Sequence, residues 1–277
     1  MRKLILAFTG FLTNPFCFAE TGPTSFSILS MGLQWDFRFS QPLSGSLTSK
    51  NWEEKIGKQL QNYDEIFSEW NPASQLRKFE SKGWQTWQTF GPEWQEIFEL
   101  SQIFFNSTEG LFDPTVGGLN FSDSPKRQGD WGNLDWTRWK NNQIRFLQNP
   151  GRLSFSGLLK GFLVAEFATQ FILEGSRFFS IDAGGGNLCQ VENHLVLFES
   201  RSSLLDTSGK QHIWNPQNQQ KSSSKKNSKI QCSLDLRNLE LKTLREKMIF
   251  LGSASDVYST VSLIGPNLPL PKNCRAD

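Results

Sequence analysis

The sequence predicts an α+β fold in which amphipathic helices pack against short strands. Two neighbouring stretches carry this prediction. In residues 158–173 the apolar residues recur at helical spacing, and residues 178–181 form a short apolar run that is typical of a buried strand. Gly175 separates the two, because glycine tolerates the left-handed conformation that often ends a helix. The 24 Phe and 10 Trp residues are enough to fill a substantial core.

The N-terminus has the pattern of a secretory signal peptide. Arg2 and Lys3 form a short basic region, residues 4–12 are mostly apolar, and Ala19 offers a small residue for cleavage. The apolar run is too short to span a membrane, and we expect no later stretch to be long and apolar enough to do so. We therefore expect residues 1–19 to be removed and residues 20–277 to form one exported domain, periplasmic in a bacterium.

Removal of the signal peptide would leave a chain of balanced charge. It takes away two basic residues and no acidic ones, so 27 of each remain. This argues against nucleic acid or an anionic membrane as a partner, because both favour a basic surface. Three cysteines remain, Cys189, Cys232 and Cys274. An oxidising compartment would allow one pair among them, and the sequence does not say which.

The other elements follow from spacing and composition. We expect an opening strand region at 25–39, helices at 52–70, 92–105 and 239–247, and a strand at 194–198. Three further segments are expected: a short extended or turn segment at 74–79, a polar, tryptophan-rich surface excursion with some hairpin character at 121–150, and a mobile basic loop at 217–229.

The start of the helix at 158–173 is the strongest candidate for a binding site. Lys160 lies in its first turn, where free backbone N–H groups and the positive end of the helix dipole add to the lysine charge. This combination favours an anion, phosphate above all, although a solvated lysine is the alternative. The glycines at 184–186 would let a bulky ligand approach the backbone, or form only a flexible turn.

Two further pairs of residues offer oxygen atoms. Asp113 and Thr115 flank Pro114 in a bend that we expect to expose a carboxylate and a hydroxyl; an Asx turn or helix cap is the alternative. Asp256 and Thr260 would lie one turn apart on the same face if residues 252–261 are helical. Their oxygens are of the hard type that Mg²⁺ prefers.

Taken in order, seven short motifs resemble those of the FAD:protein FMN transferases, the ApbE-type family, over nearly all of the mature chain. They are Met31-Gly32, Ser74-Gln75-Leu76, the segment 110–117, the segment 157–162, Gly184-Gly185, the segment 212–216, and Asp256 with Thr260. Several acidic residues of the family's motifs are replaced here, by Gln75, Ser154, Gly186 and Asn215. The chain is therefore similar to a divergent member.

The resemblance implies a two-lobed α+β fold with mixed or antiparallel sheets, flanking helices and a ligand cleft between the lobes. It also implies an enzyme that uses Mg²⁺ to move the FMN part of FAD onto a Ser or Thr hydroxyl of an exported acceptor protein. The other product would be AMP.

The resemblance assigns roles to individual residues. Lys160 would neutralise phosphate charge, and His212 would act as base on the acceptor hydroxyl or at least orient it. The metal ligands would be Asp256, Thr260 and a main-chain carbonyl near Leu159. The residues expected to hold FAD are Met31, Gln75, Asp113, Thr115, Lys160, Gly184, Gly185, His212 and Ile213.

Two alternatives to a transferase stay open. One is a module of the same fold that binds FAD or a related nucleotide without transferring it, which the replaced acidic residues favour. The other is an unrelated exported structural or interaction domain. Incubation with FAD and Mg²⁺ separates a transferase from a binding module, because only a transferase releases AMP. A lack of any flavin binding would leave only the unrelated structural or interaction domain.

Overall fold

A computed structural model describes most of the chain. The described residues are 23–41, 43, 48–83, 85–115, 131–147, 152–203, 214–215, 220–221, 227–237, 239–263 and 268–277. The predicted signal peptide lies outside them and stays a prediction, as does most of the basic loop expected at 217–229.

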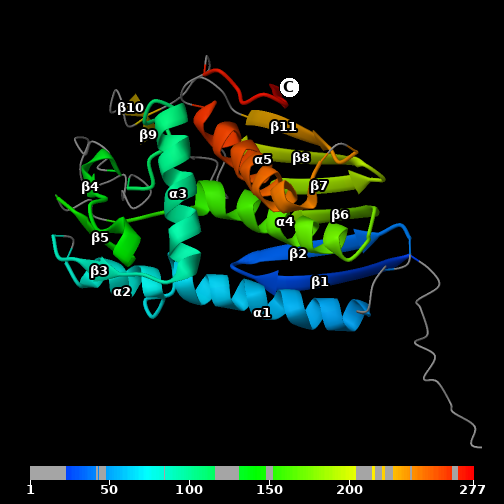
Figure 1. Ribbon diagram of the computed structural model, residues 1–277, viewed down its shortest axis with the longest axis horizontal. Helices are drawn as coiled ribbons and strands as arrows, with labels where there is room; N and C mark the ends of the chain where they lie inside the picture. The colour runs from blue at the N-terminus through cyan, green and yellow to red at the C-terminus, as the bar shows by residue number, and fades with distance from the viewer. Residues whose placement is uncertain are drawn as a thin grey trace, which may run out of the picture.

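A seven-stranded antiparallel sheet forms the centre of the fold (Figure 1). Its strands, in spatial order, are β1 (Thr24–Ser30), β2 (Leu33–Phe39), β6 (Phe178–Ala183), β7 (Asn187–Glu192), β8 (Leu195–Ser203), β11 (Asn227–Asp235) and β12 (Cys274–Ala276). Along β6, buried residues alternate with partly exposed ones, as expected for a sheet with one face on the core and one toward solvent. The prediction of an α+β fold with antiparallel sheets is confirmed.

The helices cover one face of this sheet and one end of it (Figure 1). They are α1 (Ser49–Phe67), α2 (Gln75–Ser81), α3 (Pro92–Ser107), α4 (Ser156–Leu173) and α5 (Leu241–Val261). Helices α4 and α5 pack against each other and against the sheet, α1 lies along β1, and α3 contacts α5.

Short elements complete the described chain. They are β3 (Gln88–Thr89), β4 (Leu134–Asp135) and β5 (Gln143–Phe146) in a three-stranded sheet, the pair β9 (Trp214–Asn215) and β10 (Gln220–Lys221), and the 3-10 turns η1 (Trp131–Asn133) and η2 (Trp139–Asn141).

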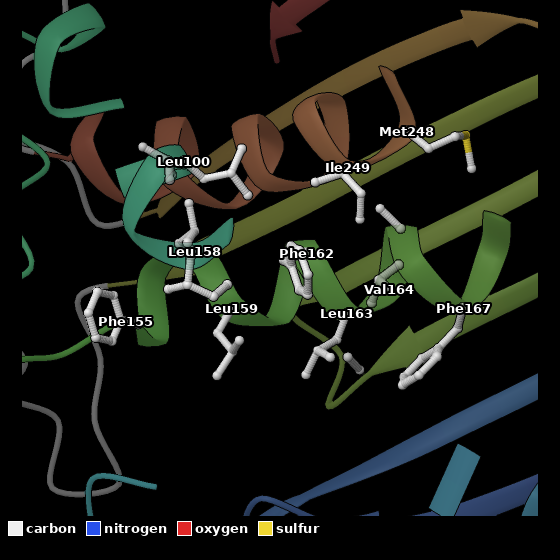
Figure 2. Close-up of a cluster of buried hydrophobic side chains, with 14 of the residues drawn as sticks. Leu100, Phe155, Leu158, Leu159, Phe162, Leu163, Val164, Phe167, Met248 and Ile249 are labelled. Carbon is white, nitrogen blue, oxygen red and sulfur yellow. The ribbon is translucent and has the colours of Figure 1, made fainter. Parts of the chain in front are cut away.

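Helix α4 is the core helix of the protein. Leu158 and Phe162 of α4 lie in one apolar cluster with Met248 and Ile249 of α5 (Figure 2). Among the described residues, α4 is long and apolar enough to cross a membrane by length and composition, which was not expected from the sequence, but a mostly buried helix of this kind is no confident membrane span. Burial accounts for this composition, because 67% of the helix is buried inside the protein.

Three predicted elements differ in the structure, each for a local reason. Residues 74–79 are not extended: Ser74 Oγ accepts a hydrogen bond from Arg77 N at 3.1 Å and caps the short helix α2. The opening strand region is a hairpin, because Met31 and Gly32 both adopt positive φ and reverse the chain between β1 and β2. The segment 239–247 is only the first part of α5, which continues to Val261.

The tryptophan-rich segment also differs from expectation. Trp131 is fully buried and stacks on Phe98 of α3, with 5.4 Å between ring centroids. Trp136 and Trp139 are partly buried against the same core. The described part of the predicted surface excursion therefore closes one side of the core, while residues 121–130 and 148–150 lie outside the described residues.

The cysteine pairing that the sequence left open is resolved. Cys232 of β11 and Cys274 of β12 form a disulfide between directly paired residues, which fastens the last strand to the sheet. Cys189 of β7 is a free, buried thiol, and burial raises its pKa.

Candidate functional site

The predicted site residues gather at one end of the main sheet. Trp35 pairs with Ala183, so the turn between β1 and β2 and the glycine turn after β6 lie at the same end. Gly184 N donates a hydrogen bond to Gln34 O at 2.9 Å and joins the two turns. The start of α4 and the end of α5 lie close together, because a Cβ on Gly157 would lie 3.7 Å from Thr260 Oγ1. They reach the same end of the sheet, because the Asn187 side chain at the start of β7 hydrogen-bonds to Asp256 of α5.

Two glycines allow α4 and α5 to cross at close range. A Cβ on Gly161 would overlap the Gly252 carbonyl oxygen and lie 2.8 Å from Asp256 Cβ. A Cβ on Gly252 would lie 2.6 Å from that of Ala165. Any larger residue would push the two backbones apart. At this crossing Gly161 N donates a hydrogen bond to Asp256 Oδ2 at 3.1 Å, so the first turns of α4 are held against the Asp256 carboxylate.

Asp256 is a buried carboxylate whose main electrostatic partner is Lys160. Burial raises the pKa of Asp256 above its usual range, while the Lys160 charge and hydrogen bonds from Gly161 N–H and the Asn187 side chain act to lower it. Lys160 itself is partly buried. The structure therefore brings together two residues that the sequence analysis selected separately, 96 positions apart.

A buried polar network supports Asp256 from the sheet side. Asn187 Oδ1 accepts a hydrogen bond from Ser200 Oγ at 2.5 Å, and Ser200 Oγ lies 2.9 Å from Ser255 Oγ. Ser255 Oγ in turn donates to Gly252 O at 2.9 Å. Sequence reasoning missed Asn187 and Ser200. The available signal for Asn187 was its strand position: it lies on the same face of β7 as the buried Cys189 and Val191, and a polar side chain on a buried face needs a partner.

The remaining predicted metal ligands lie close to Asp256. Thr260 Oγ1 donates to the Asp256 carbonyl oxygen at 3.2 Å, and Leu159 is buried in the first turns of α4. The described residues contain no group of three or more His, Cys, Asp or Glu side chains that could hold a metal. One carboxylate, one hydroxyl and main-chain oxygens fit an Mg²⁺ ion that takes its other oxygens from substrate phosphates and water.

The N-terminus of α4 is already capped by a carboxylate. Glu69 accepts a hydrogen bond from the Ser156 backbone N–H. The N–H groups of Leu158 and Leu159 both donate to Phe155 O at 2.9 Å. The N–H groups of Ser156, Leu158 and Leu159 are therefore not free, and the expectation of free N–H groups is wrong for these residues. The positive charge available to a phosphate comes chiefly from Lys160.

Asp113 and Thr115 adopt the alternative that the sequence left open. Both are buried, not exposed as expected, and Asp113 Oδ1 accepts from Thr115 N at 2.8 Å and from Thr115 Oγ1 at 2.5 Å in an Asx turn. Ser154 N donates to Pro114 O at 2.8 Å, which fixes this turn directly before α4. The pair is close to the site, and its contact with FAD stays a prediction.

The glycine turn is open to a ligand at one position. A Cβ on Gly184 would lie 2.9 Å from Leu33 Cδ2, whereas nothing lies within 4 Å of one on Gly185. Met31, in the neighbouring turn, is partly buried. His212 and Ile213 lie outside the described residues, so their predicted roles stay predictions.

Gln75 faces a different hollow. Its Oε1 accepts a hydrogen bond from Trp94 Nε1 at 3.3 Å, and it lines a pocket of about 160 Å³ with Lys78 and Lys82. A second pocket, of about 300 Å³, lies between α5 and β11 and is lined by residues that include Leu234 and Phe250. Neither pocket is lined by Lys160 or Asp256, and the ligand cleft between two lobes stays a prediction.

Comparison with known proteins agrees with this arrangement. The chain is similar in structure to the flavin transferase ApbE from Vibrio cholerae, with a TM-score of 0.66 and 12% identity over 93% of this chain and 97% of that one. The flavinyl transferase ApbE from Pseudomonas stutzeri, in its apo form, gives a TM-score of 0.64 and 10% identity over 92% and 93%. The ApbE protein from Thermotoga maritima gives 0.64 and 15% over 92% and 93%.

At these identities the structural likeness shows the fold alone. No curated protein matches the chain in sequence. A family model described as the ApbE family, however, matches residues 31–193, which is more than half of the chain and includes β2, helix α4 with Lys160, and the glycine turn after β6. This chain belongs to the ApbE family.

Proposed function

We propose that this protein is a flavin transferase that moves the FMN part of FAD onto a Ser or Thr hydroxyl of an acceptor protein and releases AMP. Membership of the ApbE family and the likeness to two flavin transferases support the proposal. The observation that carries it is the crossing of α4 and α5, which brings the Lys160 charge within electrostatic reach of the buried Asp256, at the same end of the sheet as the open glycine turn. A buried carboxylate with a perturbed pKa is typical of a functional site.

The candidate site residues have separate parts in the proposed reaction. Lys160 faces the pyrophosphate and offsets its charge as the bridging P–O bond breaks. Gly185 lets the flavin approach the backbone of the turn. Asp256, Thr260 and a main-chain oxygen near Leu159 would hold Mg²⁺, which when bound would supply further positive charge at the pyrophosphate. His212 would orient the acceptor hydroxyl or accept its proton.

We also propose that the protein works outside the cytoplasm, after cleavage near Ala19, on an acceptor in the same compartment. The Cys232–Cys274 disulfide supports this location, because such bonds persist mainly in oxidising compartments. Cell fractionation with an antibody against the protein tests it: a protein found only in the cytoplasm, with residues 1–19 retained, would contradict the proposal.

The transfer itself is tested with the purified protein, FAD, Mg²⁺ and an extract of exported proteins from the source cells. We expect AMP in the supernatant and a protein band that keeps flavin fluorescence in a denaturing gel. His212→Ala should lower the rate by about 10² to 10⁴ while FAD still binds, and Asn215→Asp should keep or increase it.

One observation favours a second function. The Asp256 carboxylate already has Gly161 N–H and the Asn187 side chain as donors and Lys160 as a countercharge, so it is compensated without a metal. This fits a module that holds FAD or a related nucleotide and does not transfer it. FAD binding with neither AMP nor a fluorescent band would support this second function and exclude the first.

A further inference from the structure

Glu69 is a partly buried carboxylate that the proposed chemistry does not use. It lies in the loop between α1 and α2, where its Oε1 accepts a hydrogen bond from Ser154 Oγ at 2.5 Å. The guanidinium of Arg77 pairs with the Glu80 carboxylate, and its Nε donates to the main-chain oxygen of Glu69 at 3.0 Å. The hydrogen bonds recorded for the Glu69 carboxylate therefore come from a hydroxyl and a backbone N–H, not from a cation.

A chain of hydroxyls connects this carboxylate to the surface. Ser154 Oγ lies 3.0 Å from Ser156 Oγ, and Ser156 is exposed at the first position of α4. Ser156 and Lys160 are four residues apart on α4, so they share a face of the helix. The outer end of the chain from Glu69 through Ser154 to Ser156 thus opens beside the lysine that is proposed to face the phosphates.

We propose that Glu69 accepts the proton of the attacking hydroxyl through Ser156 and Ser154, an inference that rests on the proposed function. The acceptor oxygen forms a bond to the flavin-side phosphorus, the bridging P–O bond breaks, and its electron pair leaves with AMP. The hydroxyl proton passes to Ser156 Oγ, the Ser156 proton to Ser154 Oγ, and the Ser154 proton to Glu69 Oε1. His212 then orients the acceptor hydroxyl and is not its base.

The surroundings of Glu69 suit this role. Burial raises the pKa of its carboxyl, and the charge of Glu80 acts in the same direction. The hydrogen bonds from Ser154 and Ser156 and the charge of Arg77 act to lower it. A carboxyl with a raised pKa is a stronger base than an exposed one, and proton transfer by a positioned group contributes about 10² to 10⁴ in rate.

The test compares Glu69→Gln with Glu192→Gln, the same change at an exposed residue at the far end of β7. The glutamine can still accept the hydrogen bonds from Ser154 and Ser156 but cannot take a proton. Single-turnover AMP release is measured against pH with Mg²⁺, FAD and the extract of exported proteins, alongside FAD affinity and thermal stability. The wild-type rate should fall as the pH is lowered through the Glu69 pKa, because protonated Glu69 cannot act as base.

We expect Glu69→Gln to bind FAD normally, to release AMP about 10² to 10⁴ times more slowly, and to lose the acidic limb of the pH profile. Ser154→Ala should slow the reaction by a comparable factor while Glu69 still caps Ser156, and Ser154→Thr should restore it. This pair keeps the test valid if Glu69→Gln is unstable.

The possible outcomes separate this inference from the proposed function. No AMP release by the wild-type protein would remove the proposed function and the inference with it. AMP release by the wild type with unchanged rates in Glu69→Gln and Ser154→Ala would overturn the inference alone. An acidic limb that persists in Glu69→Gln and vanishes in His212→Ala would also overturn it, because His212 would then be the base.

Discussion

Replacing Gly161 by alanine tests whether the close crossing of α4 and α5 holds the site together. Alanine is the better helix former by about 0.8 to 1 kcal/mol, so helix propensity alone predicts a more stable protein. The structure predicts the opposite. The added Cβ would overlap the Gly252 carbonyl oxygen and lie 2.8 Å from Asp256 Cβ, and a backbone carbonyl cannot rotate away as a flexible side chain can.

Overpacking of this kind costs about 1 to 3 kcal/mol or more, and the helices must separate to relieve it. Because the added Cβ overlaps a backbone oxygen, the upper part of this range applies, about 2 to 3 kcal/mol; after the propensity gain, we expect Gly161→Ala to lower the free energy of unfolding by about 1 to 2 kcal/mol. The melting temperature would fall by roughly 2 to 8 °C, since a domain of this size loses about 2 to 4 °C per kcal/mol. The Gly161 N–H would also move away from Asp256 Oδ2, so FAD affinity should fall with stability.

Gly57→Ala provides the matched control, because Gly57 lies inside α1 and nothing is within 4 Å of a Cβ built on it. This change should raise the free energy of unfolding by about 0.5 to 1 kcal/mol and leave FAD affinity unchanged. Both variants are compared with the wild type by urea and thermal unfolding followed by circular dichroism. If Gly161→Ala is as stable as the wild type or more so, the inference of a glycine-dependent crossing is refuted.

Three further predictions concern the ligand and the disulfide. FAD should bind more tightly with Mg²⁺ than with EDTA, and equal affinities in a fluorescence titration would remove the metal role of Asp256. Lys160→Ala should weaken FAD binding by about 1.5 to 3 kcal/mol, as for a lost hydrogen bond to a charged group. The exposed Lys58→Ala should have no effect, and equal FAD affinity in the two variants would make Lys160 a solvated residue. Replacing Cys232 and Cys274 by serine opens a link across 42 residues and should cost about 4 kcal/mol in the chain-entropy estimate. Unfolding in urea measures that loss, and an unchanged midpoint would show that the last strand does not need the link.

The sequence predicted α1, α3 and α4 because each buries a periodic apolar face, whereas only the first part of α5 was predicted. α1 and α3 appeared close to their expected bounds, and so did α4. It failed on α2, whose seven residues bury only Leu76 and Phe79, too few to show a period. It also failed on the first hairpin, because Met31 takes the left-handed position that Asn or Asp usually signals in a hairpin turn.

The candidate site was predictable where its residues are close in sequence. Asp256 and Thr260 were selected from their spacing on one helix, and Lys160 from its position at a helix start. The supporting residues come together only through strand pairing and loop packing. Asn187 meets Ser200 because β7 pairs with β8, and Glu69 meets Ser154 across 85 positions. No local sequence pattern predicts such contacts. The alternating pattern of β7 does, however, indicate a polar side chain on a buried face.

Two carboxylates, the buried Asp256 and the partly buried Glu69, flank the first turns of α4, and their different neighbours suit them to different roles. Burial raises the pKa of Asp256, and the Lys160 charge acts against that rise, which suits a cation or a phosphate-bound metal. Glu69 receives its recorded hydrogen bonds from a serine hydroxyl and a backbone N–H, and the hydroxyl leads outward to the exposed Ser156. A carboxylate connected to the surface in this way can exchange a proton, whereas Asp256 accepts hydrogen bonds from Gly161 N–H and the buried Asn187 side chain, and a positive charge acts in favour of its ionised form. When two acids in one site have different surroundings in this way, one can neutralise charge while the other transfers a proton.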